Sequence, residues 1–194
     1  PGKWGREGRF EMNLHALLDG TCSFEGTADT EVRDIVCDSR QVRPGRVFVA
    51  VRGTREDGAD YIRDAIGRGA AAVLTEKPVD VGGEVPVFRV DDATRTLALL
   101  AARYYGNPAD RLRMIGVTGT NGKTTVATLI RDMLHDASLD TGLISTVSYE
   151  VGSRVIPATR TTPEAPVLHQ LLSDMVQEEC ECAVMEVSSH ALHQ

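Results

Sequence analysis

Short apolar runs alternate with polar segments along the first half of the chain. Four runs are rich in valine and bounded by Gly, Pro or Asp, which is typical of strands; they cover 32–37, 47–51, 71–74 and 85–90. Apolar residues at helical spacing follow the second and fourth runs. These residues are Ile62, Ala65, Ile66 and Gly69, then Leu97, Leu100, Ala101 and Tyr104. The pattern predicts a small domain of mixed strands and helices.

The tripeptide Gly106-Asn107-Pro108 stops the second helical pattern and predicts a domain boundary. Beyond it, a short apolar strand at 114–118 leads through a glycine-rich turn into a helix. The apolar residues of that helix are expected on one face: Val126, Leu129, Ile130, Met133, Leu134 and Ala137.

The remaining residues continue this alternation. We expect a strand at 143–147, a hairpin at 149–156 that turns at Gly152-Ser153, and another strand at 183–187. Thr162-Pro163-Glu164 has the sequence of a helix start, with a capping hydroxyl, a proline and an acid favoured by the helix dipole. The buried stripe of that helix is expected to be Leu168, Leu171, Leu172 and Met175.

Strands that alternate with helices imply a parallel sheet with right-handed crossovers. We therefore expect an α/β protein with a small N-terminal domain at 12–108. A parallel-sheet domain with a phosphate-binding loop follows at 109–194. Residues 1–11 are interpreted as a remnant of expression or an upstream extension, with Met12 as the natural start.

The composition excludes several kinds of partner. Of the 194 residues, 42% are hydrophobic and 25% charged, as in ordinary globular proteins, and the net charge of -7 argues against a broad nucleic-acid surface. No apolar run could span a bilayer, and the N-terminus does not resemble a secretory signal. The four cysteines form no CxxC pair, which indicates reduced thiols. We expect a cytoplasmic monomer that binds no nucleic acid and does not insert into a membrane.

The segment 116–125, GVTGTNGKTT, has the pattern of a phosphate site. It follows a strand and opens a helix, where backbone amides and the helix N-terminus can face one anion. Lys123 can reach the β- and γ-phosphates of ATP, and the Thr124 hydroxyl can hold Mg²⁺. The residues expected around the nucleotide are Gly119, Thr120, Asn121, Gly122, Lys123, Thr124 and Thr125. The general pattern has its first glycine where this chain has Val117, so an unrelated turn is the alternative.

Glu186 ends the last predicted strand, and the carboxyl ends of parallel strands form the ligand edge of a sheet. From there it could hold the magnesium bound to ATP, directly or through water. The alternative is a solvated acid at a strand end. Thr161 and Thr162 precede a helix, and the simplest interpretation makes them its cap.

The string TGTNGKTT at 118–125 resembles the phosphate loop of the Mur ligase family. Three further segments resemble the branch of that family that adds the third amino acid to the muramyl peptide of cell-wall precursors. They are CDSR at 37–40 followed by PGRVFVAVRG at 44–53, TTP at 161–163, and MEVSSHAL at 185–192. Four segments in the right order and at the right intervals make the resemblance specific.

The resemblance implies that the first domain holds the uridine diphosphate end of the substrate, with Ser39 and the loop 53–56 in contact with it. The family often has histidine where this chain has Thr54. The alternative for Ser39 is a residue that merely closes a turn. In the second domain, four residues match positions that hold the muramyl peptide: Thr161, Thr162, Ser188 and Gln194. Three more match the phosphate and magnesium positions: Lys123, Thr124 and Glu186. Lys123 is thus the expected catalytic residue.

The activity that the resemblance implies is an amide-bond ligation. ATP would phosphorylate the terminal carboxylate of UDP-N-acetylmuramoyl-L-alanyl-D-glutamate, and the amine of meso-diaminopimelate or L-lysine would attack the acyl phosphate. The chain would end inside the ATPase domain, before the family's carbamylated lysine, a later magnesium histidine and its third domain. We therefore expect it to be inactive alone.

Other functions stay open at this point. Another ligase of the same superfamily, such as MurF or a folylpolyglutamate synthase, carries a similar loop. A non-catalytic UDP-sugar-binding module and a phosphate-loop kinase or GTPase are alternatives from other classes.

Overall fold

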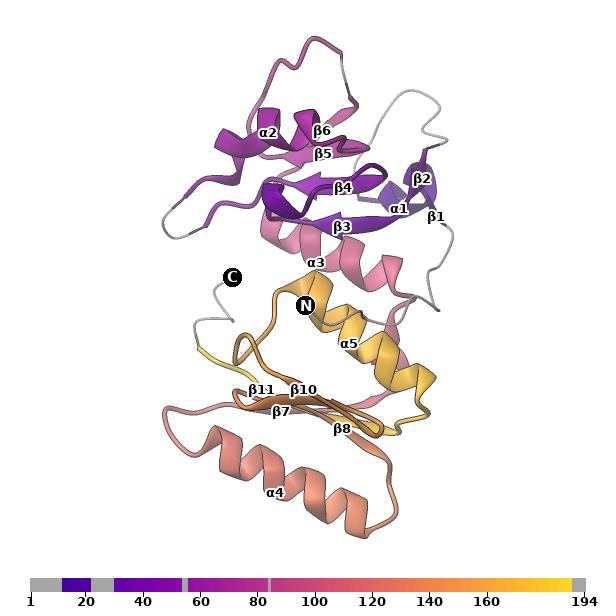
Figure 1. Ribbon diagram of the computed structural model, residues 1–194, viewed down its shortest axis with the longest axis vertical. Coiled ribbons are helices and arrows are strands. Elements are labelled where there is room, and N and C mark those ends of the chain that lie inside the picture. Colours follow the sequence, from indigo (N-terminus) through magenta and orange to yellow (C-terminus); the bar gives the residue numbers. More distant parts are fainter. Residues whose placement is uncertain (1–11, 22–29, 54–55, 84, 190–194) are drawn as a thin grey trace. The chain divides into compact units, whose positions relative to one another are not determined.

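The computed structural model describes residues 12–21, 30–53, 56–83 and 85–189. Contacts divide the chain into two compact units, Pro1–Tyr104 and Tyr105–Gln194. No sheet among the described residues runs from one unit into the other (Figure 1). The expected α/β class is confirmed. Within the same residues, no helix is both long and apolar enough to cross a membrane.

The first unit is built on four parallel strands that lie side by side in chain order, β3-β4-β5-β6. A two-stranded antiparallel ribbon, β1-β2, accompanies it. The elements are β1 Met12–Asn13, α1 Leu14–Leu18, β2 Glu31–Val32, β3 Asp34–Val36, η1 Ser39–Gln41, β4 Arg46–Val49, η2 Gly58–Tyr61, α2 Ile62–Gly67, β5 Ala72–Thr75, β6 Val87–Arg89 and α3 Ala93–Tyr104.

Alternate residues of these strands face opposite sides of the sheet. Val36, Phe48 and Val73 are buried in one cluster with Ile62 and Ala65 of α2. This packing explains why the first helical pattern of apolar residues lies between two strands: the helix covers the sheet that those strands form.

The single strand expected at 32–37 is two short strands in two sheets. Val32 pairs with Met12 in the ribbon, whereas Asp34–Val36 joins the parallel sheet beside β4. The chain switches sheets at Arg33, whose amide donates to the carbonyl of Gly45 at 2.8 Å. The valine-rich pattern at 32–37 does not reveal such a switch, because both halves are β-structure.

The second unit has a five-stranded sheet in the order β10-β9-β8-β11-β7. The strands β8, β11 and β7 are parallel, and β9 with β10 forms the expected hairpin, so the sheet is mixed. The elements are η3 Pro108–Arg111, β7 Arg113–Val117, α4 Lys123–Asp136, β8 Thr141–Ile144, β9 Ser148–Val151, β10 Arg154–Pro157, α5 Ala165–Gln177 and β11 Cys182–Glu186. The helices α4 and α5 cover opposite faces of the sheet (Figure 1).

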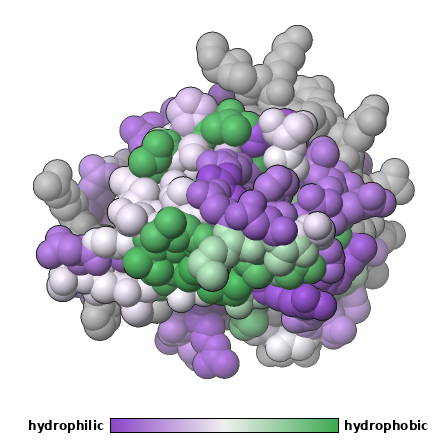
Figure 2. Space-filling model, turned by 90° about the horizontal axis from the view of Figure 1, so that it is seen from below, coloured by the Kyte–Doolittle hydropathy of each residue, from purple (hydrophilic) through white to green (hydrophobic). Residues whose placement is uncertain are grey.

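The apolar face predicted for α4 is only partly buried. Ala127 is buried, and Ile130 and Leu134 pack with it against Leu143 and Val184 of the sheet. The remaining large apolar side chains of the stripe are exposed at Val126 (45%), Leu129 (55%) and Met133 (70%). Viewed from the side of α4, apolar side chains gather on the surface (Figure 2). Successive residues of a helix lie 100° apart around its axis, so these apolar residues form a wide face. The described sheet covers only part of that face.

The predicted start of α5 at Thr162 is wrong. The helix begins at Ala165, and Glu164 precedes it without a side-chain cap. The Thr162 hydroxyl instead donates to the backbone carbonyl of Glu186 at 2.9 Å. A tertiary partner has therefore taken the hydroxyl that the local pattern assigned to the helix end.

Candidate active site at the carboxyl edge of the second sheet

The turn between β7 and α4 depends on glycine at two positions. Gly119 has φ +147° and Gly122 has φ +77°, a region that side chains disfavour. Val117 is the last residue of β7 and packs against the cluster beneath α4. This explains why the loop has valine where the general pattern has its first glycine. Position 117 still belongs to the strand and packs against the core, and the first residue with positive φ is Gly119.

The loop presents a set of donors suited to a phosphate group. Within the described part of the chain, none of the amides from Gly119 to Thr125 donates to a backbone carbonyl. The first turn of a helix leaves such amides free, and the helix dipole adds partial positive charge there. The Lys123 ammonium lies over the same loop and donates to the Gly119 carbonyl at 2.9 Å. Backbone amides and one cation around a turn are the chemistry that binds nucleotide phosphates.

Glu186 lies directly beside this loop. It ends β11 opposite Val117 of the neighbouring parallel strand, and its side chain is completely buried. The amide of Thr146 donates to Glu186 Oε1 at 2.8 Å, and the Thr146 hydroxyl donates to Oε2 at 3.1 Å. The alternative of a solvated strand-end acid is therefore wrong: this carboxylate is buried and hydrogen-bonded.

Thr161, Thr162 and Ser188 meet at the same edge. The Thr162 hydroxyl, bonded to the Glu186 carbonyl, also accepts from the Ser188 amide at 3.1 Å. The Thr161 and Thr146 hydroxyl oxygens lie 3.2 Å apart. The cap interpretation of the two threonines is wrong, because α5 has no side-chain cap and their hydroxyls bond elsewhere, that of Thr162 to the end of β11 and that of Thr161 to Thr146 after β8.

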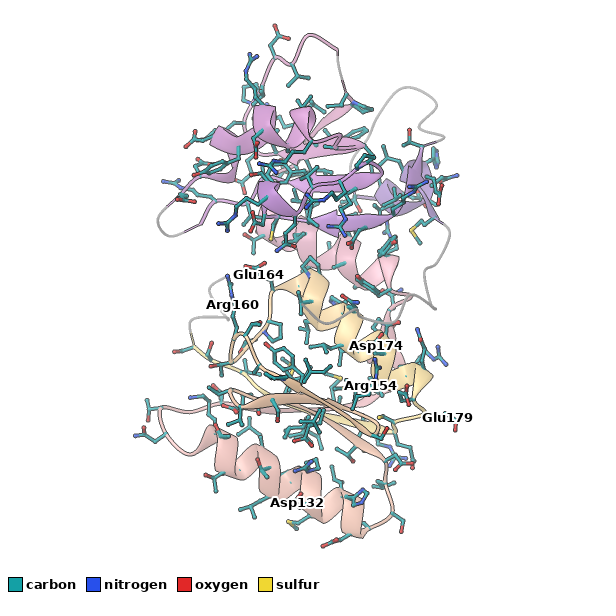
Figure 3. The ribbon with its side chains drawn as sticks, in the orientation of Figure 1. Asp132, Arg154, Arg160, Glu164, Asp174 and Glu179 are labelled. Carbon is teal, nitrogen blue, oxygen red and sulfur yellow. The ribbon has the colours of Figure 1, made fainter. Side chains whose placement is uncertain are left out.

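A buried tyrosine fixes the backbone of that segment. The Tyr149 hydroxyl donates to the Arg160 carbonyl at 2.7 Å and accepts from the Arg160 amide at 3.1 Å. The Arg160 guanidinium pairs with Glu164 at 2.7 Å in front of α5 (Figure 3). Because Tyr149 is only 2% exposed, it holds the residue next to Thr161 from the core side.

Sequence reasoning missed Thr146 and Tyr149. Thr146 follows β8 at the edge where Glu186 ends β11, so the rule that parallel strands end at one edge could have indicated it. No sequence pattern indicates a role for Tyr149, because a tyrosine in a hairpin is most simply interpreted as a core residue.

Ser39 belongs to the first unit. It opens η1, is 6% exposed, and shares a side-chain hydrogen bond with Asp64. This bond, with that from Arg68, lowers the pKa of the Asp64 carboxyl. The Asp38 carboxylate caps η1 at the Arg40 amide and pairs with its guanidinium at 2.8 Å, which lowers the pKa of Asp38. Ser39 thus has a structural partner in addition to its expected role.

Two expected contacts lie outside the described residues. Gln194 is one, and Thr54 of the loop 53–56 is the other. Gly53 and Glu56 flank that loop and close it through an amide-to-carbonyl bond of 2.9 Å.

The oxygen donors beside the loop fit a hard divalent cation. Thr124, half-buried in the first turn of α4, offers a hydroxyl, and Glu186 offers a carboxylate whose oxygens each keep a further lone pair. Cys180 does not belong to this donor set; burial raises the pKa of its thiol and keeps it protonated.

The fold and the loop together define the class: an α/β protein whose second unit has the strand–loop–helix arrangement of nucleotide-binding domains. Residues 117–194 match the profile of the Mur ligase middle domain, and residues 31–105 match the profile described as the Mur ligase family catalytic domain. The chain belongs to the Mur ligase family.

Curated relatives extend this similarity over most of the chain. It is 51% identical over 168 residues to the UDP-N-acetylmuramoyl-L-alanyl-D-glutamate--2,6-diaminopimelate ligase of Chlorobium phaeobacteroides, which covers 86% of this chain and 33% of that protein. The enzyme of the same name from Geobacillus kaustophilus is 48% identical over 183 residues, covering 94% and 37%. The chain therefore spans little more than a third of the length of these relatives.

Solved structures agree on the fold. A diaminopimelate ligase structure superposes with a TM-score of 0.79 at 24% identity, covering 95% of this chain and 37% of that one. The MurF ligase of Thermotoga maritima, solved in complex with ADP, has a TM-score of 0.56 at 29% identity and covers 81% and 32%.

Proposed function

We propose that the full-length protein is an ATP-dependent ligase that joins an amino acid to UDP-N-acetylmuramoyl-L-alanyl-D-glutamate in cell-wall synthesis, the MurE activity. The observation that carries the proposal is the phosphate loop beside a buried, hydrogen-bonded Glu186. Identity of up to 51% to enzymes named for this reaction supports it. Their names also favour 2,6-diaminopimelate over L-lysine as the added amino acid.

In this proposal the second unit binds ATP and the reacting end of the peptide. The amides from Gly119 to Thr125 and the Lys123 ammonium would hold the phosphates, and the hydroxyl of Thr124 with the carboxylate of Glu186 would hold Mg²⁺. The nucleotide supplies the phosphoryl group that activates the substrate carboxylate. Lys123 would neutralise the charge that develops on the transferred group.

The same edge carries the proposed peptide contacts. Thr161, Thr162 and Ser188 are connected to Glu186 by hydrogen bonds, so a carboxylate held by them would lie next to the phosphate loop. Gln194 is proposed as a further contact on the resemblance alone. Such a site would accelerate the reaction mainly by holding the two reactants next to each other in the correct orientation.

The first unit, with Ser39, is proposed to bind the uridine diphosphate end. Since both substrates are soluble nucleotides, we propose a cytoplasmic enzyme; the monomeric state remains a prediction.

A ligation assay on the full-length protein tests the proposal. ADP should form only when UDP-muramyl dipeptide and meso-diaminopimelate are both present, and mass spectrometry should show the tripeptide product. The matched control supplies UDP-muramyl tripeptide with D-alanyl-D-alanine, the substrates of a MurF-type ligase. Product in the control and none in the test would assign the protein to that other branch.

A further inference from the structure

Thr146 has no role in the function proposed above, yet it holds both oxygens of the buried Glu186 carboxylate. It lies in the turn between β8 and β9, forty residues before Glu186 in the chain. Its amide donates to Oε1 at 2.8 Å and its hydroxyl to Oε2 at 3.1 Å. One residue thus fixes the rotation of the whole carboxylate group.

The hydroxyl of Thr146 also meets Thr161, whose oxygen lies 3.2 Å away. A hydroxyl has a single proton, and a carboxylate is a stronger acceptor than another hydroxyl. The Thr146 hydroxyl is the donor toward both oxygens, and its proton therefore goes to Glu186 in preference to Thr161. The Thr161 oxygen is left as the weaker, second acceptor for the same proton.

The turn that presents Thr146 is itself held in place. Ser145 is 1% exposed, and its hydroxyl donates to the Ser148 carbonyl at 3.0 Å. The same oxygen accepts from the amides of Val147 at 3.2 Å and Ser148 at 3.1 Å. Thr146 is thus preorganised by its neighbours before any ligand binds, as a group that orients a functional residue must be.

We propose that Thr146 is a positioning residue that keeps the Glu186 carboxylate in the orientation in which it takes the divalent cation of the bound nucleotide. The inference rests on the proposed function in one respect, the assignment of the cation to Glu186. Thr146 would not touch the cation. It would set the direction of the lone pairs that each carboxylate oxygen keeps after accepting one hydrogen bond.

The test measures cation binding directly, by electron paramagnetic resonance titration of Mn²⁺ into the full-length protein with ADP. Thr146→Val keeps the shape and the amide bond but removes the hydroxyl, and we expect Mn²⁺ binding about three- to tenfold weaker, the net value of one ordinary hydrogen bond, because the hydroxyl acts on the cation only through the carboxylate. Thr146→Ser restores the hydroxyl and should bind Mn²⁺ within about twofold of wild type. Thr141→Val is the matched control, because the Thr141 hydroxyl bonds to the Leu139 carbonyl at the other end of β8.

A double-mutant cycle separates positioning from a general structural effect. In a Glu186→Gln background, Thr146→Val should cause no further loss of Mn²⁺ affinity, because its effect passes through the carboxylate. An equal loss in that background would overturn the proposal, as would wild-type affinity in Thr146→Val or failure of Thr146→Ser to recover it.

The outcomes distinguish this proposal from the proposed function. If Glu186→Gln leaves Mn²⁺ affinity unchanged, the cation assignment fails and the role of Thr146 fails with it. If Glu186→Gln weakens binding and Thr146→Val does not, only the positioning role is wrong. If the variants change Mn²⁺ affinity as expected but the wild-type protein catalyses no ligation, the positioning role stands and the proposed reaction does not.

Discussion

His169 gives a prediction about pH. It lies half-buried on α5, its Nδ1 has no hydrogen-bond partner among the described residues, and burial lowers its pKa. In the unfolded chain, His169 would then bind a proton near pH 6.5, whereas in the folded chain it binds one only at a lower pH. The protonated form thus favours unfolding, so stability is full above about pH 6.5 and falls as the pH drops through the lower folded pKa.

Thermal unfolding of the full-length protein at several pH values between 5.5 and 7.5 checks this prediction. The wild type should lose more stability on acidification than His169→Gln, whose amide does not titrate. The Asp174 carboxyl, whose pKa is raised by burial, is present in both proteins, so its contribution cancels in the comparison. Identical pH slopes for the two proteins would show that His169 is not responsible.

The residues of the phosphate loop could be predicted from the sequence, because their chemistry is encoded within ten consecutive positions. Glycine at positions 119 and 122, lysine at 123 and threonine at 124 indicate a turn, a cation and a hydroxyl without further context. Thr146 could not be found in this way, since its role depends on Glu186, forty positions away. The Thr162 hydroxyl is wrongly predicted to cap a helix for the same reason, because its partner Glu186 lies 24 positions away.

The elements themselves could be predicted where periodicity is strong. The hairpin around Gly152, the helix after the phosphate loop and the buried strand before Glu186 all follow from local pattern. Two features depended on tertiary structure. The valine-rich pattern at 32–37 does not distinguish one strand from two that switch sheets at Arg33. The helix α4 buries only the residues that face the described strands.

Gly142 on β8 tests how tightly α5 packs on the sheet. A Cβ built there would overlap the side chain of Met175, which is fully buried. Gly142→Ala should therefore destabilise the protein by about 1–3 kcal/mol, the usual cost of overpacking a core. Unfolding in urea measures the difference.

Gly67→Ala is the matched control for this prediction. Gly67 is the last residue of α2, and nothing lies within 4 Å of a Cβ built there. Alanine at that place should be neutral or stabilising by up to about 1 kcal/mol, because it restricts the unfolded chain. Equal destabilisation by both substitutions would mean that loss of glycine, and not contact with Met175, sets the cost.

At the scale of the whole molecule, two separate sheets suggest a division of labour between the units. If the first unit binds the uridine diphosphate end, the substrate should bind without ATP. Calorimetry of UDP-muramyl dipeptide with the full-length protein tests this. Ser39→Ala should weaken binding by about 1 kcal/mol, the net contribution of one neutral hydrogen bond.

Affinity for ADP is the internal control of that experiment, since the phosphate loop belongs to the other unit. It should stay the same in Ser39→Ala. An equal loss of affinity for both ligands would indicate a general structural effect, caused by the lost bond between Ser39 and Asp64. An unchanged dipeptide affinity would remove Ser39 from the substrate site.

ATP is proposed to activate the substrate carboxylate at the edge formed by the loop and Glu186, and oxygen isotopes test this step most directly. The full-length protein is given UDP-muramyl dipeptide labelled with ¹⁸O in the terminal carboxylate, together with ATP and meso-diaminopimelate. Passage through an acyl phosphate should transfer one ¹⁸O into each phosphate released. Lys123→Ala should slow this transfer by about a hundredfold or more. Tripeptide formed with unlabelled phosphate, or labelled phosphate released by Lys123→Ala at the wild-type rate, would contradict the account.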